Sequence, residues 1–152
     1  MRLIGAAIIR VEPGICEIAV PYKDELAQQH GYFHGGIIGA VADSAGGYAA
    51  YTLMPQDASV LTVEYKINML APADGDSLIA RGCVLRAGRT LVIARSDVMV
   101  VKSGQETLCA TLLMTSMTMR GKADHPEHGK AHARARSPAS SVSAAPARES
   151  HD

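Results

Sequence analysis

Residues 28–53 read QQHGYFHGGIIGAVADSAGGYAAYTL and decide the fold of this chain. Between residues 36 and 51 the only charged side chain is Asp43, and Ser44 is the only other strongly polar one. A helix that is apolar on every side is expected to be buried on every side. With its flanks the run could reach the length of a membrane span, but Asp43, the glycines and the polar approach argue against one. We therefore predict a long buried helix over residues 36–51.

The start and the middle of this helix offer different chemistry. Gly35 and Gly36 stand where the helix begins, so their N–H groups lack intrahelical partners and lie at the positive end of the helix dipole. Such groups can hold a carbonyl oxygen that becomes anionic. A buried carboxylate such as Asp43 is costly and persists where it is paired or used. The alternatives are that Gly-Gly is only a turn, that Asp43-Ser44 caps a later helix, and that His34 is structural.

The spacing between these groups has a consequence for any shared chemistry. Asp43 lies eight residues after Gly35, which is about 12 Å along a helix at roughly 1.5 Å per residue. One helix cannot bring both groups to the same reacting carbon. If both take part, and if the helix begins near Gly36, each site needs two subunits.

Strand-like patterns occupy most of the remaining chain. Before the helix, a strand over residues 3–11, a Pro13-Gly14 turn and a strand over 15–20 precede a short surface helix over 23–29. After it, Leu61, Val63, Tyr65, Ile67 and Met69 alternate with polar residues, which predicts a strand with one buried face. Further strands are expected at residues 78–85, 90–102 and 107–119, with a hairpin turn over 86–89. One buried helix followed by four strands predicts an α+β fold in which an antiparallel sheet wraps the helix.

Composition narrows the class of protein. A chain of 152 residues suits one domain, and its net charge of zero offers nothing to nucleic acid. Because Trp is absent and all six aromatic residues lie between Tyr22 and Tyr65, we expect a mainly aliphatic core. The three cysteines, Cys16, Cys83 and Cys109, are far apart and match no zinc or redox spacing. They favour buried free thiols in a reducing cytoplasm, and residues 3–11, although apolar, lack a signal-peptide cleavage site.

The composition changes near residue 121. Val142 is the only large aliphatic residue after that point, so we predict a domain over residues 1–120 and a disordered tail over 121–152. His125, His128 and His132 have spacings that suit a metal on a helix, but Pro126 argues against that helix. We expect no metal site.

His34-Gly35-Gly36, followed by an acid nine residues after the histidine within an apolar helix, resembles the hotdog-fold acyl-CoA thioesterases. The likeness is greatest to the phenylacetic-acid-degradation (PaaI) type of the 4-hydroxybenzoyl-CoA thioesterase superfamily, and it covers roughly residues 5–119 with the strand pattern. It implies a hotdog fold and hydrolysis of a CoA thioester to a carboxylate and free CoA, without metal or redox cofactor. It also implies a homodimer, or a tetramer built as a dimer of dimers, with active sites at the subunit interface. No membrane partner is expected.

The resemblance also implies roles for individual residues. Asp43 matches the catalytic carboxylate, a general base or a nucleophile, and the Gly35 N–H matches the group that polarises the thioester carbonyl. His34 would help bind the thioester or protonate the thiolate. Thr62 matches a Ser/Thr that positions water, although it is equally well read as an ordinary strand residue. Gln28 stands where relatives commonly carry Asn, so its amide is offered one methylene further out.

The coenzyme is expected to contact a separate set of residues. CoA carries phosphates, which call for cations and backbone N–H groups. Candidate substrate- and CoA-binding residues are Gly36, Arg86, Gly88, Arg89 and Thr90, and a solvated polar turn is the alternative for Arg86. The competing function is a non-catalytic acyl-CoA-binding or regulatory hotdog protein. Retention of Asp43 argues against it.

Overall fold

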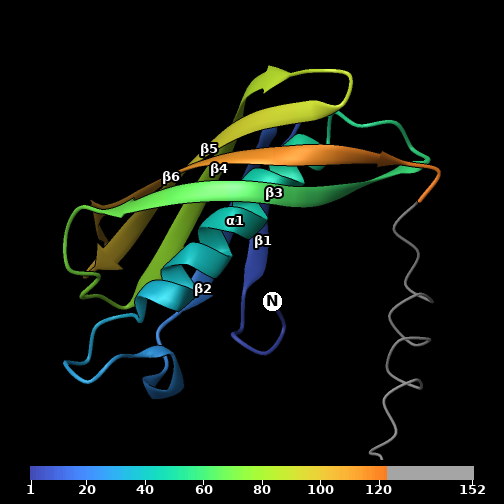
Figure 1. Ribbon diagram of the computed structural model, residues 1–152. Helices are drawn as coiled ribbons and strands as arrows, with labels where there is room; N and C mark the ends of the chain where they lie inside the picture. Colours follow the sequence, from blue (N-terminus) through green and yellow to red (C-terminus); the bar gives the residue numbers. More distant parts are fainter. Residues whose placement is uncertain (123–152) are drawn as a thin grey trace, which may run out of the picture.

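The computed structural model describes residues 1–122, and it consists of one helix held against one antiparallel sheet (Figure 1). The helix, α1, spans Gly35–Tyr51. The strands are β1 (Ala7–Glu12), β2 (Ile15–Pro21), β3 (Ala58–Met69), β4 (Ser77–Ala87), β5 (Leu91–Lys102) and β6 (Gln105–Arg120). Their order across the sheet is β1-β2-β4-β5-β6-β3, and every pair is antiparallel. The predicted hotdog fold is confirmed; residues 123–152, which hold most of the predicted tail and its histidines, lie outside the described residues.

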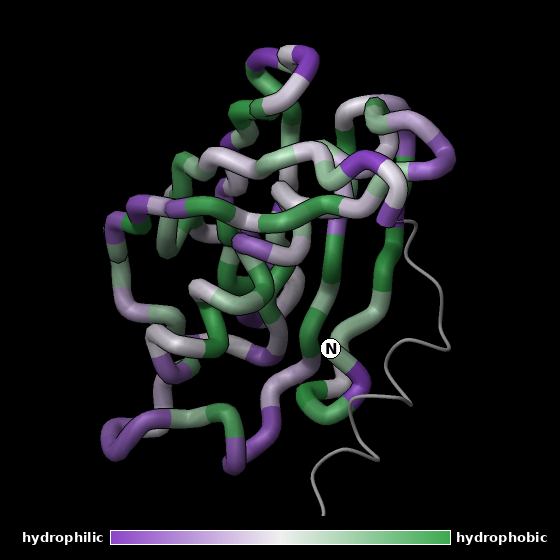
Figure 2. Tube along the Cα trace, turned by 45° about the vertical axis from the view of Figure 1, so that its right-hand side comes forward, coloured by the Kyte–Doolittle hydropathy of each residue, from purple (hydrophilic) through white to green (hydrophobic). Residues whose placement is uncertain are grey.

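The core lies between α1 and the face of the sheet that curves around it. It is mainly aliphatic, as the composition predicts, with Phe33 as the one buried aromatic residue among the described residues; its fully buried members include Ile18, Val41, Leu78, Leu112 and Met114. Small residues let α1 approach β4 closely, because a Cβ added at Gly82 would lie 2.3 Å from the Ala45 carbonyl oxygen. Hydrophobic residues run along the strands and the helix, and most turns are hydrophilic, although the turn that follows the N-terminus is largely hydrophobic (Figure 2).

The helix is not buried on every side, so that expectation is wrong. Val41, Ala42, Ala45 and Ala49 are fully buried, but Tyr48 is 41% exposed and Asp43 is partly exposed. The physical reason is that a single sheet covers only one side of a helix. The helix also begins at Gly35, one residue before the predicted start.

The segments before the helix form less regular structure than predicted. Strand β1 begins only at Ala7, because residues 1–6 form a turn in which Gly5 has φ +71° and donates its N–H to Arg2. The short helix expected at residues 23–29 is a single 3-10 turn, Asp24–Leu26, whose Leu26 side chain is buried. The four strands after the helix are present, and their limits lie within three residues of those predicted.

The alternation predicted for residues 61–69 is broken by a bulge in β3 between Thr62 and Glu64. Before the bulge, Thr62 faces α1 and bonds to Asp43. After it, Tyr65 and Met69 face α1: Cβ atoms added at Gly39 and Gly35 would lie 3.6 Å from Tyr65 Oη and 3.4 Å from Met69 Cε. A bulge shifts the side-chain alternation by one residue, so the predicted single buried face of this strand is wrong.

The cysteines also differ from the prediction in one respect. Cys16 and Cys109 are buried, but Cys83 is exposed. Burial raises the pKa of the Cys109 thiol to about 11, and its Sγ lies 3.3 Å from the Val98 carbonyl oxygen. No helix within residues 1–122 has the length and apolar character needed to cross a membrane.

Candidate active site

A closed loop precedes the helix and carries Gln28 and His34. The His34 N–H donates to the Leu26 carbonyl at 2.8 Å, and the Gln28 N–H donates to the Tyr32 carbonyl at 2.8 Å. The Gln28 side-chain Oε1 accepts from the His30 N–H at 2.7 Å. The side-chain amide oxygen of Gln28 therefore stabilises the loop through this hydrogen bond, and its NH₂ group is the donor that remains available to a substrate.

His34 is the N-cap of α1. Its Nδ1 accepts a hydrogen bond from the Gly36 N–H at 2.9 Å. A neutral imidazole that accepts at Nδ1 carries its proton at Nε2, so His34 presents a donor there. Among the described residues, no hydrogen-bond partner is recorded for the Gly35 N–H. His34, Gly35 and Gly36 are all exposed, so of the two glycine N–H groups, Gly35 offers the one available to a ligand.

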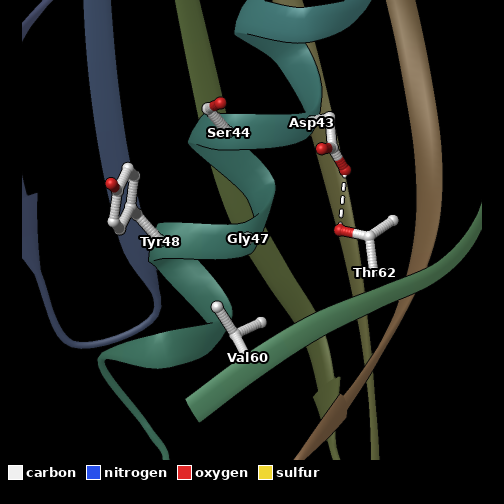
Figure 3. A pocket seen from close by; sticks show the side chains of 6 residues that line it. All are labelled: Asp43, Ser44, Gly47, Tyr48, Val60 and Thr62. Carbon is white, nitrogen blue, oxygen red and sulfur yellow. Dashed lines mark hydrogen bonds between the residues drawn. The ribbon is translucent and has the colours of Figure 1, made fainter. Parts of the chain in front are cut away.

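Asp43 and Thr62 meet on the open side of the helix. Thr62 Oγ1 donates to Asp43 Oδ1 at 2.8 Å, and Figure 3 shows the two side chains pointing at each other. They open into a pocket of about 170 Å³ lined by Asp43, Ser44, Gly47, Tyr48, Val60 and Thr62. No other hydrogen bond to the carboxylate is recorded within residues 1–122. Asp43 can therefore receive a proton or attack a carbonyl carbon through its second oxygen.

Four residues that line this pocket were not predicted as site residues from the sequence. Gly47 follows Asp43 by four residues, so helical periodicity could have placed it on the same face. Ser44 and Tyr48, one and five residues after Asp43, do not share that face, and only the structure brings them to the pocket. Val60 lies two residues before Thr62 on β3, so the two side chains lie on the same face of the strand. A Cβ added at Gly47 would meet nothing within 4 Å, so the space beside this glycine is open.

The predicted site residues fall into two groups within one chain. Asp43 and Thr62 lie together, whereas Gln28, His34 and Gly35 lie at the start of the helix, about 12 Å away by helix rise. None of the latter three lines the Asp43 pocket. Each chain thus presents two separate half-sites, one formed by Asp43 and Thr62 and the other by Gln28, His34 and Gly35.

The end of β4 and the hairpin that follows it carry all but one of the predicted substrate- and CoA-binding residues; the exception is Gly36, which lies in α1 and donates its N–H to His34 Nδ1. Arg86 and Arg89 are exposed, and neither forms an ion pair with any described residue. Gly88 is required by a close approach rather than by a positive φ, since an added Cβ would lie 2.7 Å from the Leu91 carbonyl oxygen. The Thr90 carbonyl accepts from the Thr118 N–H at 2.9 Å. None of these residues lines the Asp43 pocket.

Comparisons with known proteins agree with this architecture. The family model of the thioesterase superfamily matches residues 30–109. A protein of Saccharolobus solfataricus, provisionally named an esterase, is 37% identical over 97 residues, which are 63% of this chain and 68% of that protein. The crystal structure of a thioesterase family protein from Silicibacter pomeroyi is 44% identical with a TM-score of 0.79, and the match covers 80% of this chain and 89% of that one.

A more distant structure shares the fold. The PaaI protein from the phenylacetic acid degradation operon of E. coli is 22% identical, with a TM-score of 0.71 over 80% of this chain and 85% of that one. With the family match and the architecture above, the resemblance seen in the sequence is confirmed. The chain belongs to the thioesterase superfamily and is a thioester hydrolase.

Proposed function

We propose that this protein is an acyl-CoA thioesterase in which Asp43 and the Gly35 N–H act on the same thioester. The observation that carries the proposal is the Asp43 carboxylate, bonded by Thr62 at 2.8 Å and open to a pocket on its other side. A carboxylate fixed in this way at a partly buried position has the features of a general base or a nucleophile.

The reaction follows from the groups each half-site offers. The Gly35 N–H, at the positive end of α1, stabilises the negative charge that grows on the thioester oxygen. Asp43 either takes a proton from an attacking water or attacks the carbonyl carbon itself. The C–S bond then breaks, CoA leaves as the thiolate, and the acyl group becomes a carboxylate. The Nε2–H of His34 is placed to bind the thioester or to protonate the thiolate.

We propose that two subunits build each site. Strand β3 is a free edge of the sheet, and it runs beside α1 from the level of Asp43, at Thr62, to the level of Gly35, at Met69. Its exposed apolar side chains, Leu61, Val63, Tyr65 and Met69, suit contact with a second chain. In an antiparallel pair of β3 strands centred near Tyr65, the Met69 end of one strand lies beside the Thr62 end of the other. That arrangement brings Gly35 of one chain toward Asp43 of the next.

The coenzyme is assigned to the β4–β5 hairpin. Arg86 and Arg89 are exposed cations without an ion-pair partner among the described residues, so they are available to CoA phosphates. The paired sites suit a homodimer or a dimer of dimers. We place the protein in the cytoplasm, where free thiols such as exposed Cys83 persist.

The test is a hydrolysis screen over aromatic, short-chain and medium-chain acyl-CoAs, with detection of the free thiol. Turnover of at least one member that saturates with substrate supports the proposal. If the protein binds acyl-CoAs in calorimetry but hydrolyses none, the result favours a non-catalytic acyl-CoA-binding protein and overturns the assignment of Asp43 as a catalytic group.

A further inference from the structure

Two hydroxyl groups stand out in the core because they are buried without a partner. Ser96 on β5 and Ser116 on β6 are both 0% exposed. Neither Oγ has a hydrogen-bond partner among the described residues. A buried hydroxyl left unsatisfied costs roughly 1–3 kcal/mol. Such a group calls for an explanation.

Ser116 lies directly beside the Asp43 site. It stands opposite Thr62 in the pairing of β3 with β6. Both residues face α1: Thr62 bonds to Asp43, and Ser116 continues the buried series of Leu112 and Met114 at every second position. Side chains directly opposite each other on one face have Cβ atoms about 4.5–5.5 Å apart, and Thr–Ser pairs in this arrangement form hydrogen bonds.

The donors and acceptors of the pair are complementary. Thr62 Oγ1 gives its proton to Asp43 Oδ1, which leaves its lone pairs free to accept. Ser116 Oγ has a proton to give and no partner within the described residues. Rotation of the Ser116 side chain to another staggered rotamer changes the direction of its hydroxyl. Because Ser116 and Thr62 stand opposite each other, this rotation can direct the hydroxyl toward Thr62 Oγ1.

We propose that Ser116 is a positioning residue of the active site, which donates to Thr62 Oγ1 and completes a chain of hydrogen bonds from Ser116 through Thr62 to Asp43. This inference rests on the proposed role of Asp43. The chain holds the Thr62 hydroxyl in the rotamer that bonds Asp43, and each bond in such a chain polarises the next. The carboxylate then keeps the orientation in which its second oxygen faces the pocket.

Ser96 provides a matched control for the test. It is as deeply buried and as unpartnered as Ser116, but its neighbours across the sheet are Gly82 and Leu112. Both Ser96→Ala and Ser116→Ala remove a buried hydroxyl from the same face of the sheet and leave the fold in place. Ser96→Ala removes an unsatisfied group and should not lower the melting temperature, whereas Ser116→Ala loses the proposed hydrogen bond, worth about 1 kcal/mol, and should lower it only slightly. We expect Ser116→Ala to lower kcat by roughly fivefold to tenfold, the worth of one hydrogen bond, with KM unchanged. Ser96→Ala should leave both constants within about twofold of wild type by the same reasoning, and Ser116→Thr, which keeps the hydroxyl, should restore kcat.

A double-mutant cycle with Thr62→Val tests whether Ser116 acts through Thr62. Once Thr62 lacks its hydroxyl, Ser116→Ala should have no further effect on kcat. Equal kcat in Ser116→Ala and Ser96→Ala, or an undiminished Ser116→Ala effect in the Thr62→Val background, would overturn the inference. The proposed function is tested separately: Asp43→Asn with full turnover removes the catalytic role of Asp43, whereas an inactive Asp43→Asn beside a fully active Ser116→Ala removes only the role of Ser116.

Discussion

At the scale of single residues, Asp43 shows how a charged carboxylate is accommodated in an apolar helix despite the free energy cost of burying a charge. A carboxylate in an otherwise apolar helix is stable here because it is only partly buried and accepts a hydrogen bond from Thr62 at 2.8 Å. One carboxylate oxygen is thereby held in place, and the pocket lies beside the pair. The hydrogen bond and the exposure together account for a charged residue at this position.

Replacing Asp43 with Asn should therefore separate chemistry from folding. Asn is nearly the same size and its amide oxygen can still accept from Thr62, but it can neither take a proton nor attack a carbonyl carbon. We expect kcat to fall by roughly a hundredfold or more, with CoA binding unchanged in calorimetry. Undiminished turnover would assign Asp43 a structural role.

His34 combines two tasks that substitution can separate. Its Nδ1 caps α1 by accepting from the Gly36 N–H, and its Nε2–H is exposed at the start of the helix. His34→Ala should lower the free energy of unfolding by about 1 kcal/mol through loss of the cap. His34→Asn should recover that stability, since Asn is a strong N-cap residue, but not the turnover. Denaturant unfolding and kcat, measured on both variants, provide the test; recovery of full activity by Asn would show that only the cap matters.

At the scale of elements, the closeness of α1 to the sheet depends on glycine at one position and not at another. A Cβ at Gly82 on β4 would lie 2.3 Å from the Ala45 carbonyl oxygen, which is backbone and cannot move aside cheaply. A Cβ at Gly47 on α1 meets nothing within 4 Å, because the Asp43 pocket lies there. A side chain can therefore be added at Gly47, where it would enter the pocket, but not at Gly82, where it would collide with the backbone of the helix.

This contrast predicts opposite effects of the same substitution. Gly82→Ala should lower the free energy of unfolding by about 1–3 kcal/mol, because the helix must move away from the sheet. Gly47→Ala should raise it by about 0.5–1 kcal/mol, since alanine is the better helix former, while the added methyl group narrows the pocket. Denaturant unfolding of the two variants checks both signs. A stable Gly82→Ala protein would mean that α1 lies further from β4 than the structure places it.

At the scale of the whole molecule, the two half-sites of one chain define what assembly must accomplish. Asp43 and Thr62 lie part way along α1, and His34 and Gly35 lie at its start, about 12 Å away by helix rise. A thioester group is much smaller than this separation. The proposed chemistry therefore requires the start of one helix to approach Asp43 of another chain.

Mixing two inactive proteins tests this shared site. Asp43→Asn removes one half-site and Gly35→Val obstructs the other; the first added carbon at Gly35 meets only the flexible Met69 Cε at 3.4 Å, so this variant should fold. With random exchange, half of the dimers are mixed and each has one intact site of two, so about a quarter of wild-type activity should return. Subunit exchange and the folding of both parents are verified first by native mass spectrometry and circular dichroism. Inactive heterodimers would place each site within one chain.

The sequence by itself determined the elements whose signals are local. The apolar run with Gly35-Gly36 at its start predicted α1 to within one residue, and the two-residue period after it predicted the strands of the sheet. The candidate residues Asp43, Gly35 and His34 were recognised because the motif is contiguous along the chain. The catalytic roles proposed for them remain predictions.

Only the tertiary structure decided which face each side chain occupies. The bulge after Thr62 turns that residue toward Asp43 and breaks the predicted alternation, and no local pattern marks where a strand gains an unpaired residue. Likewise, the exposure of Cys83 and Tyr48 and the pairing of Thr62 with buried Ser116 depend on strand order and on the single layer of sheet. These are contacts between segments far apart in the chain, and their free energies depend on packing that short-range periodicity does not contain.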